Sequence, residues 1–532
     1  GRRTYAIKAK AFKTLLVARY RKMTGGKVPN SEAMSAGLLA IEGVAVHDRP
    51  EYDAHVRVAE SGGRVYVHMA NEDDTVIEIG PGGWRECNDP PVRFLRPGGI
   101  GALPKPQPGG RLDDLRKFLN VPDDAAWALV RAWLAMAFRQ RGPFPLLVLL
   151  GEQGSAKSTT ARLLRRLIDP RELALRAQPK DVRDLMIAAR TTWVLAFDNL
   201  SWLPDWLSDA LCRLATGGGF GTRGLYTDDE EQTFNATRPV ILNGIEDFVT
   251  RPDLLERTLL ICHPPIDEAK RRPESELLTE FEAAIPKLLG ALFDYVAGGL
   301  RELPAVCVPG LPRMADFALF AVACEVARSG SGDEFLRAYR ENQAGANEQV
   351  LDESLVAIAV RQLMADRDEW RDTPTALLEA LNGMVTEAQR KEKEWPKKPN
   401  TLSNKLRRLA PVLRRADRID VRIGEKVPDR KRTRHTIIWR LPDNSPGGSS
   451  APSEPSAPAD SRPPTGTPAA DDTLDPDDPQ IVHPSSEPDG ELLHDSWQLD
   501  DADDADDPPG PSTGRVPDPP VTPDGNRRRG RV

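Results

Sequence analysis

The sequence of 532 residues has few cysteines and no pattern that would pair them. Its five cysteines are scattered, odd in number and form no C-x-x-C pair, and its seven histidines show no spacing typical of metal ligands. We therefore expect neither a disulfide framework nor a structural metal, which is typical of a protein of the reducing cytoplasm.

A long apolar run and a signal segment are also missing. The longest apolar run, Pro143 to Leu150, is far shorter than the roughly 20 residues that span a bilayer. No basic-then-apolar segment opens the chain, so we expect a cytoplasmic location and no membrane partner. The chain starts with Gly1 inside a basic stretch, which suggests a missing N-terminal portion, although a processed start would look the same.

Acidic charge is concentrated at the C-terminal end. The net charge is −8, but residues 443–532 hold 20 acidic and 6 basic residues, whereas residues 1–442 hold 60 acidic and 66 basic. The same tail carries 18 of the 48 prolines, so we predict that it is disordered. It could recruit replication proteins, compete for a basic module of the same chain, or only improve solubility.

The chain is too long for one compact domain. Period-two alternation over residues 53–97 predicts a small β-meander, and residues 143–265 alternate apolar strands with helices, the pattern of a parallel α/β sheet. We expect six parts: a helical and β-meander region (1–110), a helical connector (111–142), an α/β P-loop NTPase core (143–265), a helical region (266–349), a basic winged-helix-like module (350–442) and the tail (443–532).

A phosphate-binding loop follows the apolar strand 145–150. Its residues are Gly151, Glu152, Gln153, Gly154, Ser155, Ala156, Lys157, Ser158 and Thr159, and an apolar helix face comes next. Strand, loop, Lys-Ser and helix is the P-loop context, in which the lysine meets the β/γ-phosphates of ATP and the serine binds Mg²⁺. Ala156 replaces the usual second glycine, which is tolerable if its φ stays negative.

Two further strands end in polar residues. The strand 192–197 ends in Asp198, a candidate for Mg²⁺, and strand 238–242 ends in Asn243, a candidate sensor of the γ-phosphate. Taken alone, Asn243 is better explained as an Asn-Gly strand-end turn, but its position after the two other motifs favours the sensor. Asn199 stands where a glutamate commonly activates water, so either another carboxylate is the base or hydrolysis is slow.

Arginines near these strands have two interpretations. Arg257, and less so Arg251, precedes the strand 258–262, where a ring ATPase presents an arginine finger to its neighbour; a surface ion pair with Asp253 or Glu256 is the alternative. Arg223 and Tyr226 lie in a glycine-rich segment that is either a hairpin touching nucleic acid or a plain surface loop.

These motifs, in this order, resemble the superfamily 3 helicases of the AAA+ class, which replicate viruses, phages and plasmids and include primase-linked and virulence-associated-E-like ATPases. The resemblance spans about Leu146 to Ile266, and residues 1–440 also look like ATP-binding proteins of actinobacterial prophages and plasmids. It implies ATP with Mg²⁺, a hexameric ring and translocation on single-stranded DNA. The matching positions are Lys157, Ser158, Asp198, Arg223, Tyr226, Asn243 and Arg257.

Residues 397–440 are strongly basic, with 15 basic and 4 acidic residues. Leucines at helical spacing from Leu402 to Leu413 predict a helix that Asn400 or Thr401 would cap, with a kink at Pro411. Two strand-like runs follow, so helices at 352–365 and 374–390 would complete a winged helix. The DNA contacts that we predict are Lys405, Arg407, Arg408, Arg414 and Arg415 on the helix, and Lys431, Arg432 and Arg434 in the loop.

The leading hypothesis is therefore an ATP-dependent DNA helicase acting on single-stranded or forked DNA in the replication of a mobile element. A nucleotide-switched protein that assembles on DNA without unwinding it is the main alternative, because Asn199 puts hydrolysis in question. An NTPase of DNA defence or packaging would have similar parts.

Overall fold

The computed structural model describes residues 4–442 apart from 8, 51, 224–230, 246–247 and 427–433, and the side chains of 220–223, 231–235 and 426 are not described either. Residues 1–446 form one compact unit. Tyr226, Lys431, Arg432 and the predicted tail lie outside the described residues, as does the side chain of Arg223.

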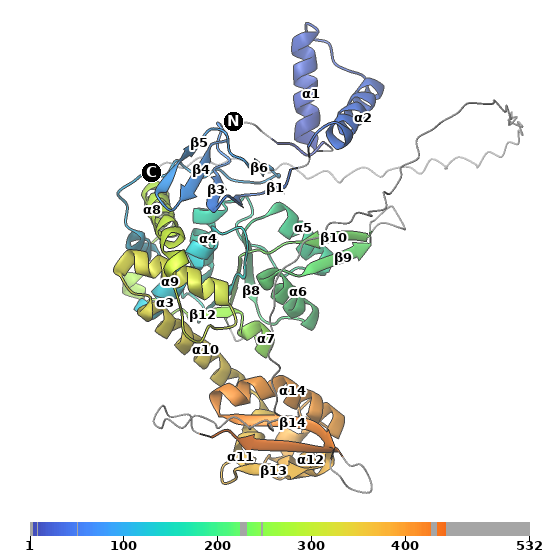
Figure 1. Cartoon of the computed structure of the whole chain (residues 1–532), viewed down its shortest axis with the longest axis vertical. Helices are drawn as coiled ribbons and strands as arrows, with labels where there is room; N and C mark the ends of the chain where they lie inside the picture. The colour runs from blue at the N-terminus through green and yellow to red at the C-terminus, as the bar shows by residue number, and fades with distance from the viewer. Residues whose placement is uncertain are drawn as a thin grey trace, which may run out of the picture. The chain divides into compact units, whose positions relative to one another are not determined.

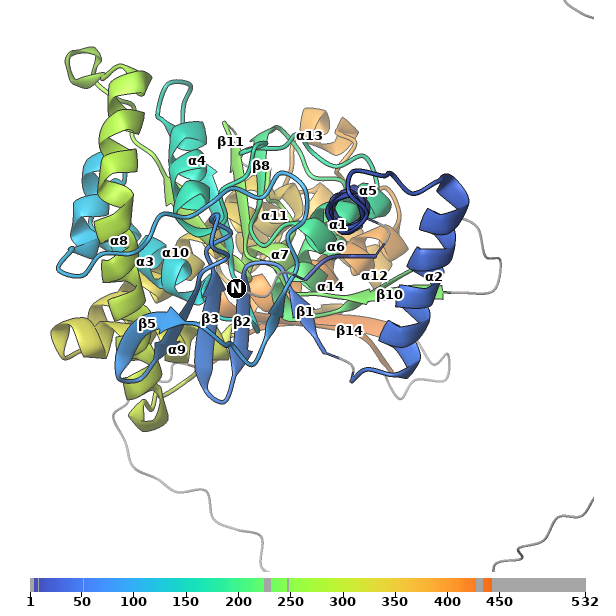
Figure 2. The ribbon, with the colours of Figure 1, turned by 90° about the horizontal axis from the view of Figure 1, so that it is seen from above.

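The first two helices, α1 (Lys10–Met23) and α2 (Ser31–His47), bury none of their residues although α2 is largely apolar. In Figure 1 they lie apart from the layers around the central sheet, and the view from above in Figure 2 draws α1 in front of α5 and α6. The chain then forms the predicted β-meander, an antiparallel sheet in the order β2-β3-β4-β5, with a small parallel pair beside it. The strands are β1 (Ala54–His55), β2 (Val58–Ser61), β3 (Arg64–His68), β4 (Val76–Gly80), β5 (Gly83–Cys87) and β6 (Arg93–Phe94).

A buried ion pair joins the meander to the nucleotide-binding part. Arg57 Nε donates to Asp169 Oδ1 at 3.1 Å, and both side chains are fully buried. The other carboxylate oxygen, Oδ2, accepts the backbone N–H groups of Trp193 and Val194. One carboxylate therefore bonds both to the meander and to the nucleotide-binding part, so the two parts are joined by a buried contact as well as by the chain.

The predicted helical connector contains two helices with a break between them. A 3₁₀ helix, η1 (Leu112–Phe118), precedes α3 (Asp124–Met136), whose N-cap Asp123 accepts the N–H of Ala126 at 2.7 Å. Pro122 lies between them and disfavours helical geometry in the residue before it, which gives the physical reason for the break.

The nucleotide-binding part contains a parallel sheet in the order β12-β7-β11-β8. Both figures place α3 and α8 on one side of these strands and α5 and α6 on the other. Between α6 and β11 the chain forms an antiparallel pair, β9 with β10, where the glycine-rich segment was identified. The elements are β7 (Leu146–Leu150), α4 (Lys157–Ile168), α5 (Val182–Thr191), β8 (Leu195–Leu200), α6 (Asp205–Thr216), β9 (Gly219–Arg223), β10 (Glu231–Asn235), β11 (Val240–Gly244), α7 (Pro252–Leu255) and β12 (Thr258–Cys262).

Residues 266–349 are helical as predicted, with η2 (Glu268–Lys270), α8 (Glu274–Glu302), η3 (Leu303–Ala305), α9 (Ala315–Ser329) and α10 (Asp333–Glu353). Among the described residues, only the segment Glu274–Ala305 is long and apolar enough to cross a membrane, and 67% of its most apolar window is buried inside the protein. A core helix of a soluble protein gives the same result, so this is weak evidence for a membrane span.

The C-terminal module contains α11 (Leu355–Leu363), β13 (Glu369–Asp372), α12 (Pro374–Asn382), α13 (Glu387–Lys391), α14 (Pro399–Ala416), β14 (Ile419–Lys426) and β15 (Arg434–Arg440). Its sheet has the order β13-β15-β14. The predicted cap at Asn400 or Thr401 is wrong, because α14 begins at Pro399, which needs no hydrogen-bond acceptor at the first helical position.

Candidate functional site

The predicted phosphate loop connects β7 to α4 and borders a cavity of about 390 Å³. Asp198 and Asn199 from β8, and Asn243 and Gly244 from β11, line the same cavity. All these residues lie at the carboxyl ends of parallel strands, where open α/β sheets bind their ligands. The fold thus brings together loop, acid and amide that are separated by some 90 residues of sequence.

The lysine of the loop lies folded against the loop itself. Lys157 Nζ donates to the carbonyl oxygens of Gly151 at 2.6 Å and Glu152 at 2.7 Å. Burial lowers the pKa of Lys157, and the nearby Asp198 carboxylate opposes this change. The ammonium is therefore held at the cavity by neutral carbonyl acceptors, which a negatively charged phosphate oxygen can replace.

The two predicted Mg²⁺ ligands are in contact. Ser158 Oγ donates to Asp198 Oδ1 at 2.9 Å, although the residues come from different elements. A hydroxyl and a carboxylate oxygen are the hard donors that Mg²⁺ takes from proteins.

Asn243 is almost fully buried, with 1% of its surface exposed. Its Oδ1 accepts the backbone N–H of Asn199 at 2.9 Å, whereas its Nδ2 has no hydrogen-bond partner among the described residues. A buried amide N–H without a partner is costly, so the group is available to a ligand in the cavity. Asn199 adopts a φ of 57°, a left-handed conformation that asparagine tolerates better than most residues.

The condition under which Ala156 would be tolerable does not hold. Its φ is 63° and its ψ 25°, so this alanine occupies the left-handed region that the expected glycine would favour. The loop has kept its backbone path despite the side chain. For an L-residue this conformation costs roughly 1–2 kcal/mol.

We therefore expect Ala156→Gly to stabilise the protein by about 1 kcal/mol, since it removes this strain. Urea unfolding followed by tryptophan fluorescence measures the effect. Ala161→Gly, in the middle of α4, is the matched control and should be destabilising because glycine disfavours helix interiors. Destabilisation by Ala156→Gly would show that the loop does not carry the strain.

Asn120 and His263, which the sequence analysis did not predict as site residues, stabilise the phosphate loop through hydrogen bonds. Asn120 Nδ2 donates to the carbonyl oxygens of Ser155 at 3.1 Å and Pro264 at 2.7 Å, and His263 Nδ1 donates to the Asn120 carbonyl at 2.6 Å. Burial lowers the pKa of His263, and Lys157 lowers it further. The only sequence signal was the position of His263 directly after a strand.

The two candidate finger arginines are engaged within the chain. Arg257 pairs with Asp253 at 2.6 Å and its side chain is 12% exposed, while Arg251 pairs with Asp209 at 2.8 Å. This arrangement is the one that the ion-pair alternative predicts. To act as an arginine finger toward a neighbouring subunit, Arg257 would have to break its ion pair with Asp253.

Family comparison identifies the chain. The model of the actinomycete integrative conjugative element replication protein matches residues 112–348, and the model of the C-terminal domain of the same kind of protein, RepA, matches residues 356–451. The two matches cover more than half of the chain. The chain belongs to this family of replication proteins. The expected resemblance to replication proteins of mobile elements is confirmed, with a conjugative element in place of a phage or plasmid.

Solved structures give weaker likenesses. The replication protein is 12% identical to SCCmec type IV Cch, titled an active helicase, over 80% of this chain and 87% of that chain, with a TM-score of 0.40. It is 12% identical to the apo C-terminal region of NrS-1 over 80% of this chain and 90% of that chain, with a TM-score of 0.34. Likenesses at this level carry no argument about activity. No curated protein sequence matched the chain.

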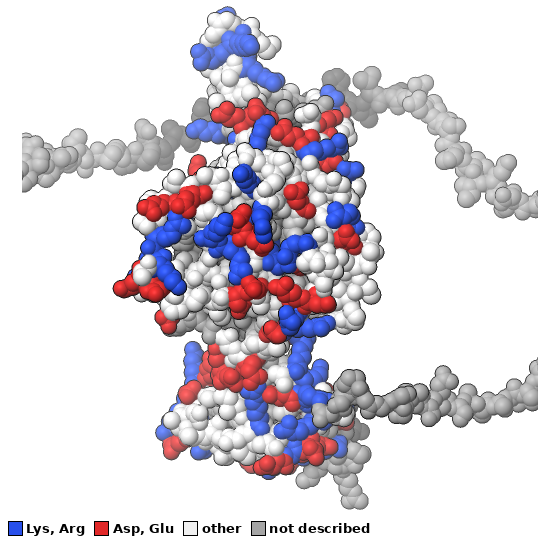
Figure 3. Space-filling view, turned by 90° about the vertical axis from the view of Figure 1, so that its left-hand side faces the viewer, with Lys and Arg blue, Asp and Glu red and all other residues white. Residues whose placement is uncertain are grey.

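In the C-terminal module of the replication protein, several predicted DNA contacts have partners in the chain. Arg414 pairs with Asp420 at 2.6 Å, Arg407 donates to Asn404 at 2.8 Å, and Lys405 donates to the Glu394 carbonyl. Arg415 pairs with Glu256 of the nucleotide-binding part. Arg408 and Arg434 are exposed. On the face drawn in Figure 3, basic and acidic side chains are interspersed rather than gathered by sign.

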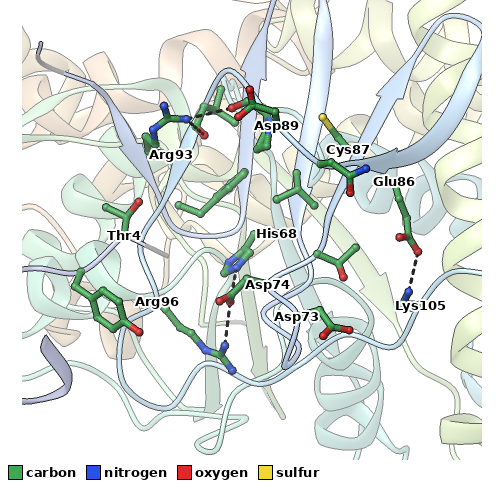
Figure 4. Close-up of a pocket in the computed structure, with 17 residues that line it drawn as sticks. Thr4, His68, Asp73, Asp74, Glu86, Cys87, Asp89, Arg93, Arg96 and Lys105 are labelled. Carbon is green, nitrogen blue, oxygen red and sulfur yellow. Dashed lines mark hydrogen bonds and ion pairs between the residues drawn. The ribbon is translucent and has the colours of Figure 1, made fainter. Parts of the chain in front are cut away.

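A second cavity, of about 260 Å³, lies on the meander of the replication protein (Figure 4). Here His68 Nε2 is 3.3 Å from Asp74 Oδ1, Arg96 donates to the same oxygen, and the His68 ring stacks on Phe94. Burial lowers the pKa of His68 to about 4; Arg57 adds to this and Asp74 opposes it. His68 is therefore neutral near pH 7.

Between pH 6.5 and about 4 the unfolded chain binds a proton at His68 that the folded chain does not, so stability must fall as the pH falls through this window. The full loss from this one group is about 3 kcal/mol. We expect His68→Gln to flatten the fall in the free energy of unfolding, measured by urea unfolding at several pH values. His47→Gln, on the surface of α2, should leave the slope unchanged; equal slopes in all three proteins would contradict the assignment.

Proposed function

We propose that this replication protein is an ATP-dependent DNA helicase that acts in replication of its conjugative element. The observation that carries the proposal is a cavity lined by Lys157, by the contacting pair Ser158 and Asp198, and by Asn243, whose Nδ2 has no partner among the described residues. In a replication protein, a nucleoside triphosphate with Mg²⁺ is the ligand that suits this set.

Each residue then has a defined task. Lys157 exchanges the carbonyl oxygens of Gly151 and Glu152 for phosphate oxygens, and the N–H groups at the start of α4 meet the same phosphates. Ser158 and Asp198 would hold Mg²⁺, which would supply charge neutralisation at the transferred phosphate. Asn243 donates its Nδ2–H to the γ-phosphate or to the attacking water.

The attacking water needs a general base, and the part of the cavity that the structure describes offers one carboxylate for this role. Asp198 is the one carboxylate among the described residues that line the cavity, and it faces Ser158. Asn199 cannot accept a proton. This observation favours a second candidate function, a nucleotide switch that assembles on DNA and turns ATP over slowly.

We assign the C-terminal module to DNA binding through a winged helix. Three helices, α11, α12 and α14, with the sheet β13-β15-β14 support this assignment, and the predicted contact arginines Arg408 and Arg434 are exposed. Phosphates of single-stranded or forked DNA would bind these guanidinium groups. A hexameric ring in the cytoplasm, with Arg257 as a finger to the neighbouring subunit, completes the proposal.

ATPase activity with and without single-stranded DNA, together with unwinding of a forked duplex, tests the function. A helicase hydrolyses ATP faster with DNA and separates the strands. DNA-stimulated hydrolysis without strand separation would rule the helicase out, and nucleotide-dependent DNA binding with negligible turnover would establish the switch. Absence of both nucleotide and DNA binding would contradict both functions.

The double variant Arg408→Gln with Arg434→Gln tests the DNA assignment separately. It should weaken binding of single-stranded DNA and reduce the salt dependence of that binding, because two phosphate contacts are lost. Arg272→Gln is the control, because Arg272 lies outside the C-terminal module and pairs with Glu280. Unchanged affinity in the double variant would place DNA elsewhere.

A further inference from the structure

Four arginines surround a small cavity at the far end of α4, away from the phosphate loop. Arg162, Arg165 and Arg166 share one face of the helix, and Arg171 follows it; together with Glu282 of α8 they line a space of about 170 Å³. Arg165 lies eight residues beyond Lys157, about 12 Å along the helix axis. The cavity is therefore distinct from the nucleotide site.

Arg165 differs from its neighbours because no carboxylate among the described residues pairs with it. Arg162 pairs with Glu274, and Arg166 makes two bonds of 2.7 Å to Glu282. Arg165 is 1% exposed, and its Nη1 donates to the backbone carbonyls of Leu173 and Ala174. Its Nε and Nη2 have no hydrogen-bond partner among the described residues. Two nitrogens of a buried cation, which carry three N–H bonds, therefore have no acceptor among the described residues.

The nearest buried acid is already committed. Both oxygens of Asp169 are engaged, by Arg57 at 3.1 Å, by Arg171 at 3.5 Å and by two backbone N–H groups. Burial lowers the pKa of Arg165 to about 10; Asp169 opposes this, while Arg171 and Arg176 add to it. The region holds more positive charge than its own acids balance, and a buried charge without a counter-ion is costly.

We propose that this cavity binds a phosphate group, with Arg165 as the principal ligand and Arg162, Arg166 and Arg171 around it. Guanidinium groups bind the oxygens of phosphate through paired N–H donors, and several of them favour a doubly charged oxyanion over a carboxylate. The phosphate supplies the counter-ion that Arg165 lacks among the residues that the structure describes.

An anion here would act on the nucleotide site through the backbone. Arg165 holds the carbonyls of Leu173 and Ala174, and two residues later the carbonyl of Arg176 accepts the N–H of Asp198 at 2.8 Å. The segment 173–176 therefore connects Arg165 to the predicted Mg²⁺ ligand. Binding of phosphate at one end of α4 would fix this segment and, with it, the position of Asp198.

The experiment uses the full chain with Lys157→Ala, so that the phosphate loop no longer competes for the probe. Thermal unfolding is followed against inorganic phosphate, with sodium chloride at matched ionic strength as reference. We expect a saturable rise in Tm with phosphate that Arg165→Gln abolishes or weakens at least tenfold in Kd and that Arg272→Gln leaves unchanged. No phosphate-specific rise, or the same rise with Arg165→Gln, would overturn the proposal.

Variants of Glu282 and Arg166, which also line the cavity, provide a second test if Arg165→Gln does not fold. Glu282→Gln frees Arg166 and should tighten phosphate binding several-fold, whereas Arg166→Gln leaves Glu282 unpaired and should weaken it. Changes of the same sign, or none, would count against the site.

The phosphate could be a free ion or a nucleotide, or a phosphodiester of bound DNA. A short single-stranded oligonucleotide added at saturating phosphate distinguishes these sources. Displacement of phosphate by the oligonucleotide assigns the site to the DNA backbone, and additive binding of the two assigns it to the free oxyanion. Either result leaves the site itself supported.

Discussion

Replacing Lys157 with alanine is expected to lower ATP turnover by about a hundredfold or more, since no other cation among the described residues lines the nucleotide cavity. The lysine ammonium lies against two loop carbonyls and is the group that would meet the β/γ-phosphates. Phosphate release under saturating ATP measures turnover, and fluorescence of a labelled nucleotide measures binding.

Lys180→Ala, an exposed lysine outside the cavity, is the matched control and should retain full turnover. Lys157 also donates hydrogen bonds to two carbonyls of the loop, so its loss could destabilise the loop. The thermal stability of the variant is therefore measured as well. Turnover within about threefold of the unmodified protein would mean that the chemistry does not depend on this loop.

The largest effect on stability is expected from Asp169→Asn, at about 3–5 kcal/mol. The substitution removes the charge that pairs with Arg57 in the fully buried bond between meander and core, and it leaves several buried arginines without an acid. Urea unfolding gives the free energy, and loss of a single cooperative transition would reveal that the meander separates first.

Asp114→Asn is the control for this variant, because its carboxylate pairs with Lys117 at the surface and exposed pairs contribute little. If the two variants lose stability equally, the buried carboxylate does not join the two parts as the structure indicates.

The sequence pattern predicted those features whose structure is determined by residues close together in the chain. Alternation was enough for the meander, and a strand followed by Gly151–Thr159 was enough for the turn into α4. Strand ends placed Asp198 and Asn243 at one edge because parallel strands align their carboxyl ends. The boundaries between the six predicted parts and the roles of the site residues stay predictions.

Features that depend on contacts between distant residues were out of reach. Asn120 supports the loop through Ser155, 35 residues away, and Arg57 meets Asp169 across 112 residues. Strand β13 was missed because Glu369, Arg371 and Asp372 give no apolar alternation, and it forms only by pairing with β15. The φ of Ala156 is set by the path of the loop, which residue identity alone does not fix.

The Arg415 guanidinium cannot pair with Glu256, as it does in the structure, and at the same time bind a DNA phosphate. Glu256 lies next to Arg257 in sequence and also binds Arg313. If DNA takes Arg415, Glu256 loses a partner. Any nucleotide state that strengthens the Arg415–Glu256 pair must therefore weaken DNA binding, and DNA must weaken binding of that nucleotide by the same factor. A single carboxylate would then give the two halves of the replication protein a reciprocal thermodynamic coupling without any direct contact between their ligands.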